Sequence, residues 1–133
     1  MGINKKTWKA ISLKQPWANL IASGKKTIET RKWKTPYRGD VVICSSKSPD
    51  IAPAGCALCI VELYSVEPMK KEHEAKACIK VYPHAYGWFL RNIRLIVPPV
   101  PVKGELGVFN LSGSAKKRIL ASFAKKVPRT DKV

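Results

Sequence analysis

Side chains suited to nucleotide contacts gather between residues 13 and 31, in one short segment of the chain. Three lie where a predicted strand meets a predicted helix, and three lie on the strand that follows: Lys14, Gln15 and Trp17, then Lys26, Glu29 and Arg31. Tryptophan beside cations can stack on a base while the cations meet its phosphate. We expect Trp17 and the later charged trio to converge on one solvent-open hollow that takes a nucleotide or an unstacked base.

Alternation along the predicted strand decides which of these side chains share a face. Glu29 and Arg31 fall on one face, and Lys26 falls on the opposite face with Ile28. Glu29 and Arg31 can form an ion pair that leaves guanidinium donors free for a ligand. The same pattern also suits a structural ion pair with Trp17 in the core, and the sequence leaves both interpretations open.

Cys56 and Cys59 have the two-residue spacing of a zinc knuckle or redox pair. They lie within residues 56–66, which predict a buried strand, and side chains three apart on a strand point to opposite faces. The other two cysteines and the two histidines have no fitting spacing. We therefore expect buried, reduced cysteines, and neither a metal ion nor a cofactor.

The charge balance is strongly basic, with 25 Lys and Arg against 9 Asp and Glu and a formal net charge of +16. Such a field attracts polyanions and speeds their capture in a salt-dependent way. Solubility alone and an anionic membrane surface are the competing explanations. RNA or DNA, or a nucleotide ligand, is the partner that the charge favours, and a membrane is not expected.

Alternating apolar residues and turn residues predict more strands than helices. Strands follow strands with few helices between them, which favours a small barrel over a βαβ fold. The predicted fold class is mainly β (α+β), a barrel of five to six strands with short peripheral helices. The predicted strands cover residues 8–13, 26–33, 41–46, 56–66, 86–97 and 106–111, and the predicted helices cover residues 17–23 and 70–77.

The C-terminal part of the chain is basic, and it can form either a helix or a flexible tail. As a helix over residues 114–127 it would have Ile119, Leu120 and Phe123 as its only apolar contacts. The expected organisation is one domain over residues 1–113, followed by this basic helix or tail over 114–133.

The chain has 133 residues and contains neither the apolar stretch that crosses a bilayer nor a secretory signal. These features predict a cytoplasmic protein, and we expect a monomer.

Several separated motifs resemble the ASCH domain family, in the order that the family has them. They are Lys14-Gln-Pro-Trp17, Gly24-Lys-Lys-Thr-Ile-Glu-Thr-Arg-Lys-Trp33, Arg38-Gly-Asp40, Ser46-Lys-Ser-Pro49, Tyr86-Gly-Trp-Phe-Leu90 and Pro99-Val-Pro-Val-Lys-Gly104. The resemblance spans about residues 8–111. It implies a PUA-like β-barrel with helices at its rim, a cleft beside residues 24–31, and binding of RNA or another nucleic acid. The motifs complete the candidate binding set: Lys14, Gln15, Trp17, Lys26, Glu29, Arg31, Arg38 and Lys47.

The same resemblance leaves an enzyme as the alternative. Some small bacterial members of the family are amidohydrolases that deacetylate acetylcytidine with a lysine, a threonine and a glutamate, and another has been described as a ribonuclease. By position the lysine falls on Lys26, the threonine falls on Glu29, which is a departure, and the glutamate falls near Glu72 or Glu74. Direct hydrolysis would then use Glu29 as general base and Lys26 to hold the developing oxyanion.

A protein-interaction adaptor is the third possibility. It would use Pro98-Pro-Val-Pro101 as a docking edge. Proline in this place more simply blunts an exposed strand against unwanted pairing.

Overall fold

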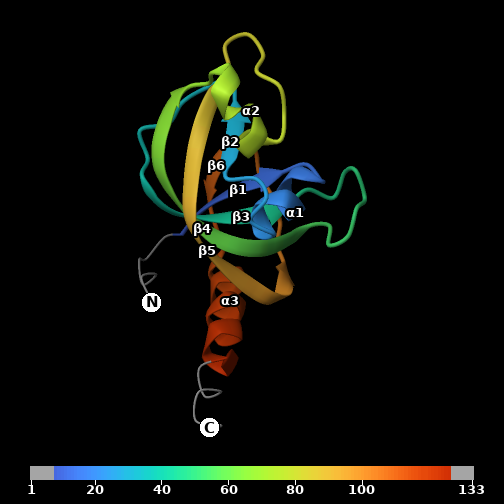
Figure 1. The fold of residues 1–133 in the computed structure, drawn as a ribbon. Helices are drawn as coiled ribbons and strands as arrows, with labels where there is room; N and C mark the ends of the chain where they lie inside the picture. The colour runs from blue at the N-terminus through green and yellow to red at the C-terminus, as the bar shows by residue number, and fades with distance from the viewer. Residues whose placement is uncertain (1–7, 127–133) are drawn as a thin grey trace, which may run out of the picture.

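Six strands form a single curled sheet that makes a half-barrel (Figure 1). The computed structural model describes residues 8–126, so the basic ends at residues 1–7 and 127–133 lie outside the described residues. The strands are β1 (Lys9–Leu13), β2 (Ile28–Arg31), β3 (Gly39–Ser45), β4 (Cys56–Pro68), β5 (Tyr86–Pro101) and β6 (Val108–Asn110). The predicted PUA-like barrel of five to six strands is confirmed.

The sheet order is β2-β5-β4-β3-β1-β6. All neighbours are antiparallel except β1 and β3, which run parallel. The parallel pair requires a crossover, and the crossover carries a short helix and strand β2. This connection brings residues 14–31, which hold most of the candidate site, to the rim of the barrel beside β1.

The helices are short except at the C-terminal end. They are α1 (Trp17–Ala22), the 3₁₀ turn η1 (Lys71–His73), α2 (Glu74–Ala77) and α3 (Gly113–Lys126). Helix α1 docks on the sheet through Ala18 and Ile21, which are fully buried. Within residues 8–126, no helix has both the length and the apolar character that crossing a membrane requires.

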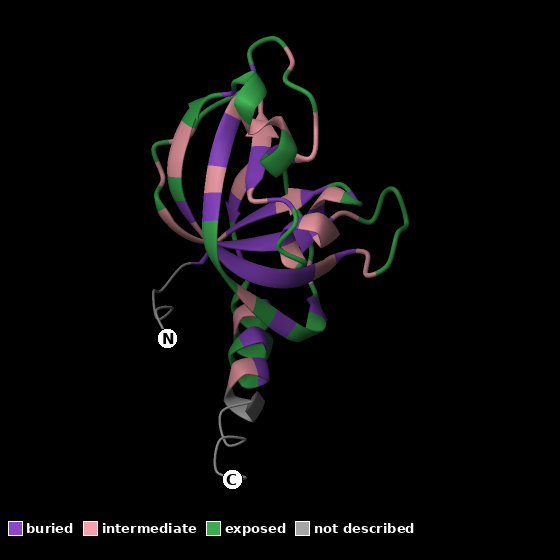
Figure 2. Ribbon diagram, in the orientation of Figure 1, coloured by how far each residue is buried: buried purple, intermediate pink, exposed green. Residues whose placement is uncertain are grey.

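The core occupies both surfaces of the sheet (Figure 2). One cluster joins Trp8, Ile96 and Phe109 to Ile119 of α3. A second cluster lies inside the curl and includes Trp88, which is 2% exposed, and a smaller third cluster joins Ile28 to Ala77 of α2. The central strands β3 and β4 are therefore covered on both surfaces, which is why their sequences are nearly continuous apolar runs.

Residues 98–101 lie within β5 rather than in a connection. They pair with β4 on one side, with Pro101 opposite Cys56, while β2 reaches only as far as Phe89 on the other side. Helix α3 lies along that free side: Ser122 Oγ donates to the Val97 carbonyl at 2.8 Å, and Arg118 Nη2 donates to the Pro101 carbonyl at 3.0 Å. The Pro101 carbonyl on the docking edge that an adaptor would use, and the Val97 carbonyl just before it, are therefore occupied by the protein's own helix.

Helix α3 buries a different set of residues from the expected one. Ile119 is 0% exposed and Phe123 packs on the core, as expected, but Leu120 is 38% exposed. Ala115 and Ser122 are buried instead. Residues four apart share a helix face, so Ala115, Ile119 and Phe123 form one stripe, and Leu120 is turned about 100° away from it.

Cys56 and Cys59 do not diverge as strict alternation predicts. Both pack against the cluster inside the curl, because a β-bulge between Ala57 and Cys59 shifts the register of β4. A bulge adds one residue to a strand and so reverses the alternation beyond it. Cys59 and Cys44 are free thiols buried to 0% exposure, and burial raises the pKa of each thiol to about 12.

Candidate functional site

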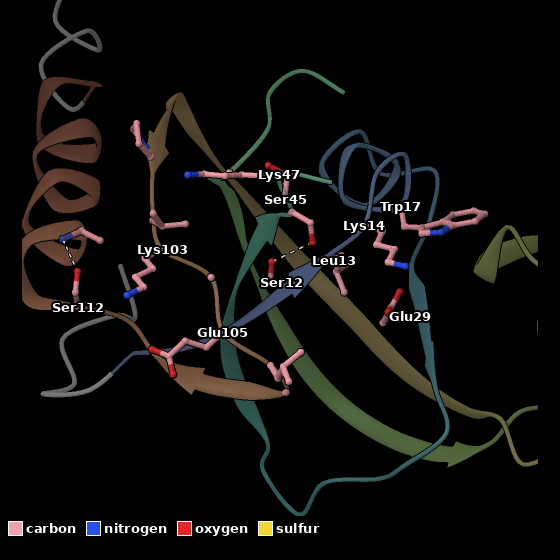
Figure 3. Close-up of a pocket in the computed structure, with 18 of the residues that line it drawn as sticks. Ser12, Leu13, Lys14, Trp17, Glu29, Ser45, Lys47, Lys103, Glu105 and Ser112 are labelled. Carbon is pink, nitrogen blue, oxygen red and sulfur yellow. Dashed lines mark hydrogen bonds between the residues drawn. The ribbon is translucent and has the colours of Figure 1, made fainter. Parts of the chain in front are cut away.

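An open groove of about 1160 Å³ runs across the rim of the barrel from α1 to the start of α3. Its floor is formed by β1, β2 and the end of β3, and its walls are the loop after β3 and the loop between β5 and β6. Figure 3 shows Trp17 and Glu29 at the end near α1, and Lys103 and Ser112 at the end beside α3. The segments that meet here are far apart in the sequence.

Most of the charged side chains that line the groove are cations. They are Lys14, Lys26, Arg31, Lys47, Lys103 and Arg118, against the carboxylates Glu29 and Glu105. Within residues 8–126, the ammonium groups of Lys14, Lys47 and Lys103 make no hydrogen bond and no ion pair. These three lysines are the groups most available to an anionic ligand.

Two glycines in the walls of the groove allow close contact with neighbouring segments. Gly55 has φ +65°, which favours glycine, and a Cβ there would lie 2.9 Å from Cγ of Lys47, so a larger residue would displace the Lys47 stem. Val102 N donates to the Gly55 carbonyl at 3.0 Å, which joins the two walls. Gly104 approaches Ser12 so closely that a Cβ would lie 3.0 Å from the serine hydroxyl oxygen.

Glu29 forms two ion pairs at the α1 end of the groove. Its Oε1 lies 3.7 Å from Lys26 Nζ and its Oε2 lies 3.1 Å from Arg31 Nε. The Arg31 contact is ionic without hydrogen-bond alignment, because the buried Nε finds no hydrogen-bond partner in the described part of the chain. Arg31 is held from the other side, where Nη2 donates to the Ser12 carbonyl at 3.3 Å.

Lys26 is the most enclosed cation of the site, at 2% exposure. Its ammonium group donates to the carbonyl of Ala77, at the end of α2, and lies 5.4 Å from the centroid of the Trp17 ring. Contact with an aromatic face, a carbonyl and a carboxylate is the environment in which a buried ammonium can remain charged. Lys26 therefore links α2, Trp17 and Glu29.

Burial acts on both members of the Lys26–Glu29 pair. Desolvation lowers the pKa of the Lys26 ammonium, and the nearby Glu29 carboxylate offsets part of the change. Desolvation raises the pKa of the Glu29 carboxyl, offset in part by Arg31 and then by Lys26. Both changes favour the neutral form of each side chain and bring the two pKa values closer together. Perturbed pKa values of this kind are concentrated at functional sites.

Six of the eight predicted site residues line this groove: Lys14, Trp17, Lys26, Glu29, Arg31 and Lys47. Glu29 and Arg31 share a face as the alternation predicts. The prediction that Lys26 points to the opposite face is wrong in its premise, because β2 begins only at Ile28 and the alternation does not extend back to residue 26.

The other two predicted site residues hold the fold together instead of lining the groove. Gln15 is 3% exposed, and its amide donates to Asn19 Oδ1 and accepts from the Asn19 backbone N–H. Arg38 donates through Nη1 to the carbonyls of Thr35 and Tyr37, which fixes the turn before β3. Neither side chain reaches the groove.

The amidohydrolase resemblance also implies a glutamate near Glu72 or Glu74, and neither of these side chains lines the groove. Glu74 accepts a hydrogen bond from the backbone N–H of Val81 at 2.8 Å, and Glu72 is exposed on η1. Among the described residues, no cluster of three or more His, Cys, Asp or Glu side chains could hold a metal ion. The chemistry at the α1 end therefore depends on Lys26, Glu29 and Arg31.

Sequence reasoning missed the far half of the groove. Lys103, Glu105 and Arg118 come from the loop before β6 and from α3, more than 70 residues beyond the segment that carries Trp17. The Pro99–Gly104 run was the available signal, since it is one of the family motifs. Its place on the groove depends on a long-range contact that no local pattern reports.

A comparison with protein-family models identifies the family of this chain. A sequence model of the ASCH domain matches residues 11–100. Activating signal cointegrator 1 of Mus musculus and the protein of the same name from Homo sapiens are each 25% identical over 139 residues, covering 83% of this chain and 24% of theirs. The chain thus spans about a quarter of the length of these relatives.

Solved structures show the same fold. ASCH from Zymomonas mobilis superposes with a TM-score of 0.66 at 16% identity, covering 88% of this chain and 96% of that one. A serine-to-alanine variant of that protein gives a TM-score of 0.65, also at 16% identity, over 90% and 98% of the two chains. At this level of identity the likeness concerns the fold alone.

Proposed function

Because the chain belongs to the ASCH domain family, we propose that it is a nucleic-acid-binding module whose groove takes a single strand of RNA. The observation that carries the proposal is the row of lysines without partners, Lys14, Lys47 and Lys103, along an open groove. Phosphates of a bound strand would replace the counterions around these lysines, and release of the counterions favours binding.

The size of the groove favours an oligonucleotide over one nucleotide. Pockets for small molecules measure roughly 300–1000 Å³, and this groove, at about 1160 Å³, exceeds that range and is open along its length. The strand would enter near Trp17, place a base against the indole ring, and follow the lysines toward α3. Single strands suit this geometry because their bases can leave the stack and meet protein side chains.

Fluorescence anisotropy with labelled seven-nucleotide RNA tests the proposal. At about 50 mM salt we expect saturable binding that weakens steeply as salt is added. Matched DNA and free nucleotides in the same assay separate strand binding from nucleotide binding. Absence of saturable binding to any RNA or DNA at low salt would contradict the proposal.

A second candidate function is hydrolysis of a modified nucleoside such as acetylcytidine. The buried pair Lys26 and Glu29, with pKa values shifted toward each other at the edge of a groove, favours it. Glu29 would take a proton from the water that attacks the acetyl carbonyl, and Lys26 would stabilise the oxyanion that forms there. Collapse of this intermediate would break the C–N bond, release acetate, and pass the proton from Glu29 to the amino group of the departing cytidine. Chromatography of acetylcytidine incubated with the protein measures this activity. Turnover that persists in both K26A and E29A variants would remove the pair from the mechanism.

A further inference from the structure

Glu29 is a carboxylate at one end of a groove whose other charged side chains are mainly cations. A carboxylate repels phosphate, so it weakens electrostatic attraction for a nucleic-acid backbone at this point. Glu105, the other carboxylate of the groove, is exposed on a loop, whereas Glu29 is only 8% exposed and lies at the same end of the groove as Trp17. Such a group is suited to hydrogen-bond donors on a base rather than to phosphate.

The Glu29 carboxylate is held in place before any ligand arrives. Lys26 and Arg31 flank its two oxygens, and each is anchored in turn, Lys26 to the Ala77 carbonyl and Arg31 to the Ser12 carbonyl. A carboxylate has about four lone-pair positions. The 3.7 Å contact with Lys26 is long, the Arg31 contact is misaligned, and the backbone N–H of Thr30 donates to the same carboxylate, so these partners leave part of its acceptor capacity for a ligand in the groove.

The four bases differ in what they offer to two neighbouring carboxylate oxygens. Guanine presents N1–H and N2–H₂ side by side on its Watson–Crick edge, so both oxygens can accept. Adenine and cytosine present one amino group next to a ring acceptor, and uracil presents one N–H between two carbonyls. Figure 3 shows that Lys14 reaches into the same end of the groove, where an ammonium group could meet guanine O6.

From this geometry we propose that Glu29 makes the groove select guanine at the base position beside Trp17. The inference rests on the proposed binding of single-stranded RNA and adds a base preference to it. Both carboxylate oxygens and a nearby lysine then match the three hydrogen-bonding groups on the guanine edge. The remaining nucleotides of the strand are held through their phosphates, so the protein shows no base preference at their positions.

Four labelled RNA heptamers test the selection: UUUGUUU, UUUCUUU, all-uridine, and UUUIUUU, in which inosine keeps N1–H and O6 but lacks the 2-amino group. We expect wild-type protein to bind the guanine probe about tenfold more tightly than the inosine probe, the size of one hydrogen bond to a charged group. In Glu29→Gln the two affinities should come within about twofold of each other. If Glu29 had only a structural role, Glu29→Gln would instead weaken the binding of all four probes by the same factor.

Glu105→Gln is the matched control, because it removes the other carboxylate of the groove and should leave the guanine-to-inosine ratio unchanged. If Glu29→Gln fails to fold, as judged by its thermal melt, Glu29→Asp keeps the charge but withdraws the carboxylate by one methylene, and it should also lose the ratio. Equal wild-type affinities for all four probes overturn guanine selection while RNA binding stands. Tightest binding of the cytosine probe overturns it as well, whereas no binding of any probe defeats the proposed function itself.

Discussion

Trp17 and Lys26 illustrate how single residues set the character of the groove. The ammonium group of Lys26 covers one side of the indole at 5.4 Å from its centroid, while Trp17 remains half-buried and lines the groove. An aromatic ring that lines a groove, with a cation near one of its faces, can serve as a platform on which one base stacks. Trp17 therefore has a role in binding that does not depend on net charge.

Replacing Trp17 with alanine tests this role. Stacking is worth about 1–3 kcal/mol per base, so W17A should weaken binding of an RNA heptamer by roughly 5- to 150-fold. The dependence of affinity on salt should stay the same, since no charge is removed. Trp17→Phe, which keeps an aromatic face, is the control and should retain most of the affinity. Unchanged binding in W17A would show that no base stacks there.

The protonation of Glu29 gives a second prediction for a single residue. Burial raises the pKa of this carboxyl above its ordinary value of 4.5, so acidification neutralises it earlier than an exposed glutamate. A protonated carboxyl has lost one acceptor, and guanine selection should be present at pH 8 and lost as the pH falls. The guanine-to-inosine affinity ratio, measured from pH 8 to pH 4, should have a midpoint above 4.5. A flat profile in wild type, like the one expected for Glu29→Gln, would contradict this account.

Among the elements, helix α3 joins the barrel to the far end of the groove. It packs Ile119 into the core and places side-chain donors on the carbonyls of β5 through Arg118 and Ser122. Its first turn lines the groove beside Lys103. We therefore expect α3 to fold with the barrel as one cooperative unit, although the sequence alone suggested a boundary at residue 113.

Two adjacent substitutions test whether α3 belongs to that unit. Ile119 is 0% exposed, so I119A should lower the free energy of unfolding by about 2–5 kcal/mol. Leu120, its 38% exposed neighbour, should tolerate L120A with a loss of less than about 1 kcal/mol. Urea denaturation followed by circular dichroism measures both. Equal, small losses would mean that α3 is a detachable tail.

Local sequence patterns predict the elements well but not their irregularities. Each expected strand and each short helix is present, because alternation, β-branched runs and turn residues act over a few neighbours. The bulge between Ala57 and Cys59 changes the sheet face to which the following side chains of β4 point. Strand β2 begins at Ile28 rather than at Lys26. Both depend on pairing with β5, which local alternation does not include.

At the scale of the whole molecule, the groove depends on three distant segments meeting at one rim. Residues 12–31 supply the end with Trp17, residues 45–55 supply Lys47, and residues 101–118 supply the end with Lys103, while Ile79 adds a single lining residue. The first segment was predictable because its chemistry is dense in sequence and resembles a family motif. The third was not, since its contribution comes from the close approach of Gly104 to Ser12 and from the docking of α3.

The groove also decides which part of the +16 charge matters. If only the total charge of the protein mattered, the loss of any two lysines would weaken RNA binding equally. Lys47 and Lys103 line the groove, whereas Lys71 and Lys76, on η1 and α2, are not among the residues that line it. The two pairs carry the same charge and are all exposed, so they make matched variants.

The salt dependence of RNA-heptamer affinity, compared among wild type, K47A/K103A and K71A/K76A, tests the binding groove most directly. Each phosphate contact on a single strand contributes about 0.7 to the slope of log affinity against log salt, so K47A/K103A should be shallower by about 1.4 and K71A/K76A should match wild type. Equal slopes in the two double variants would show that RNA is held by the general field of the protein and not by this groove.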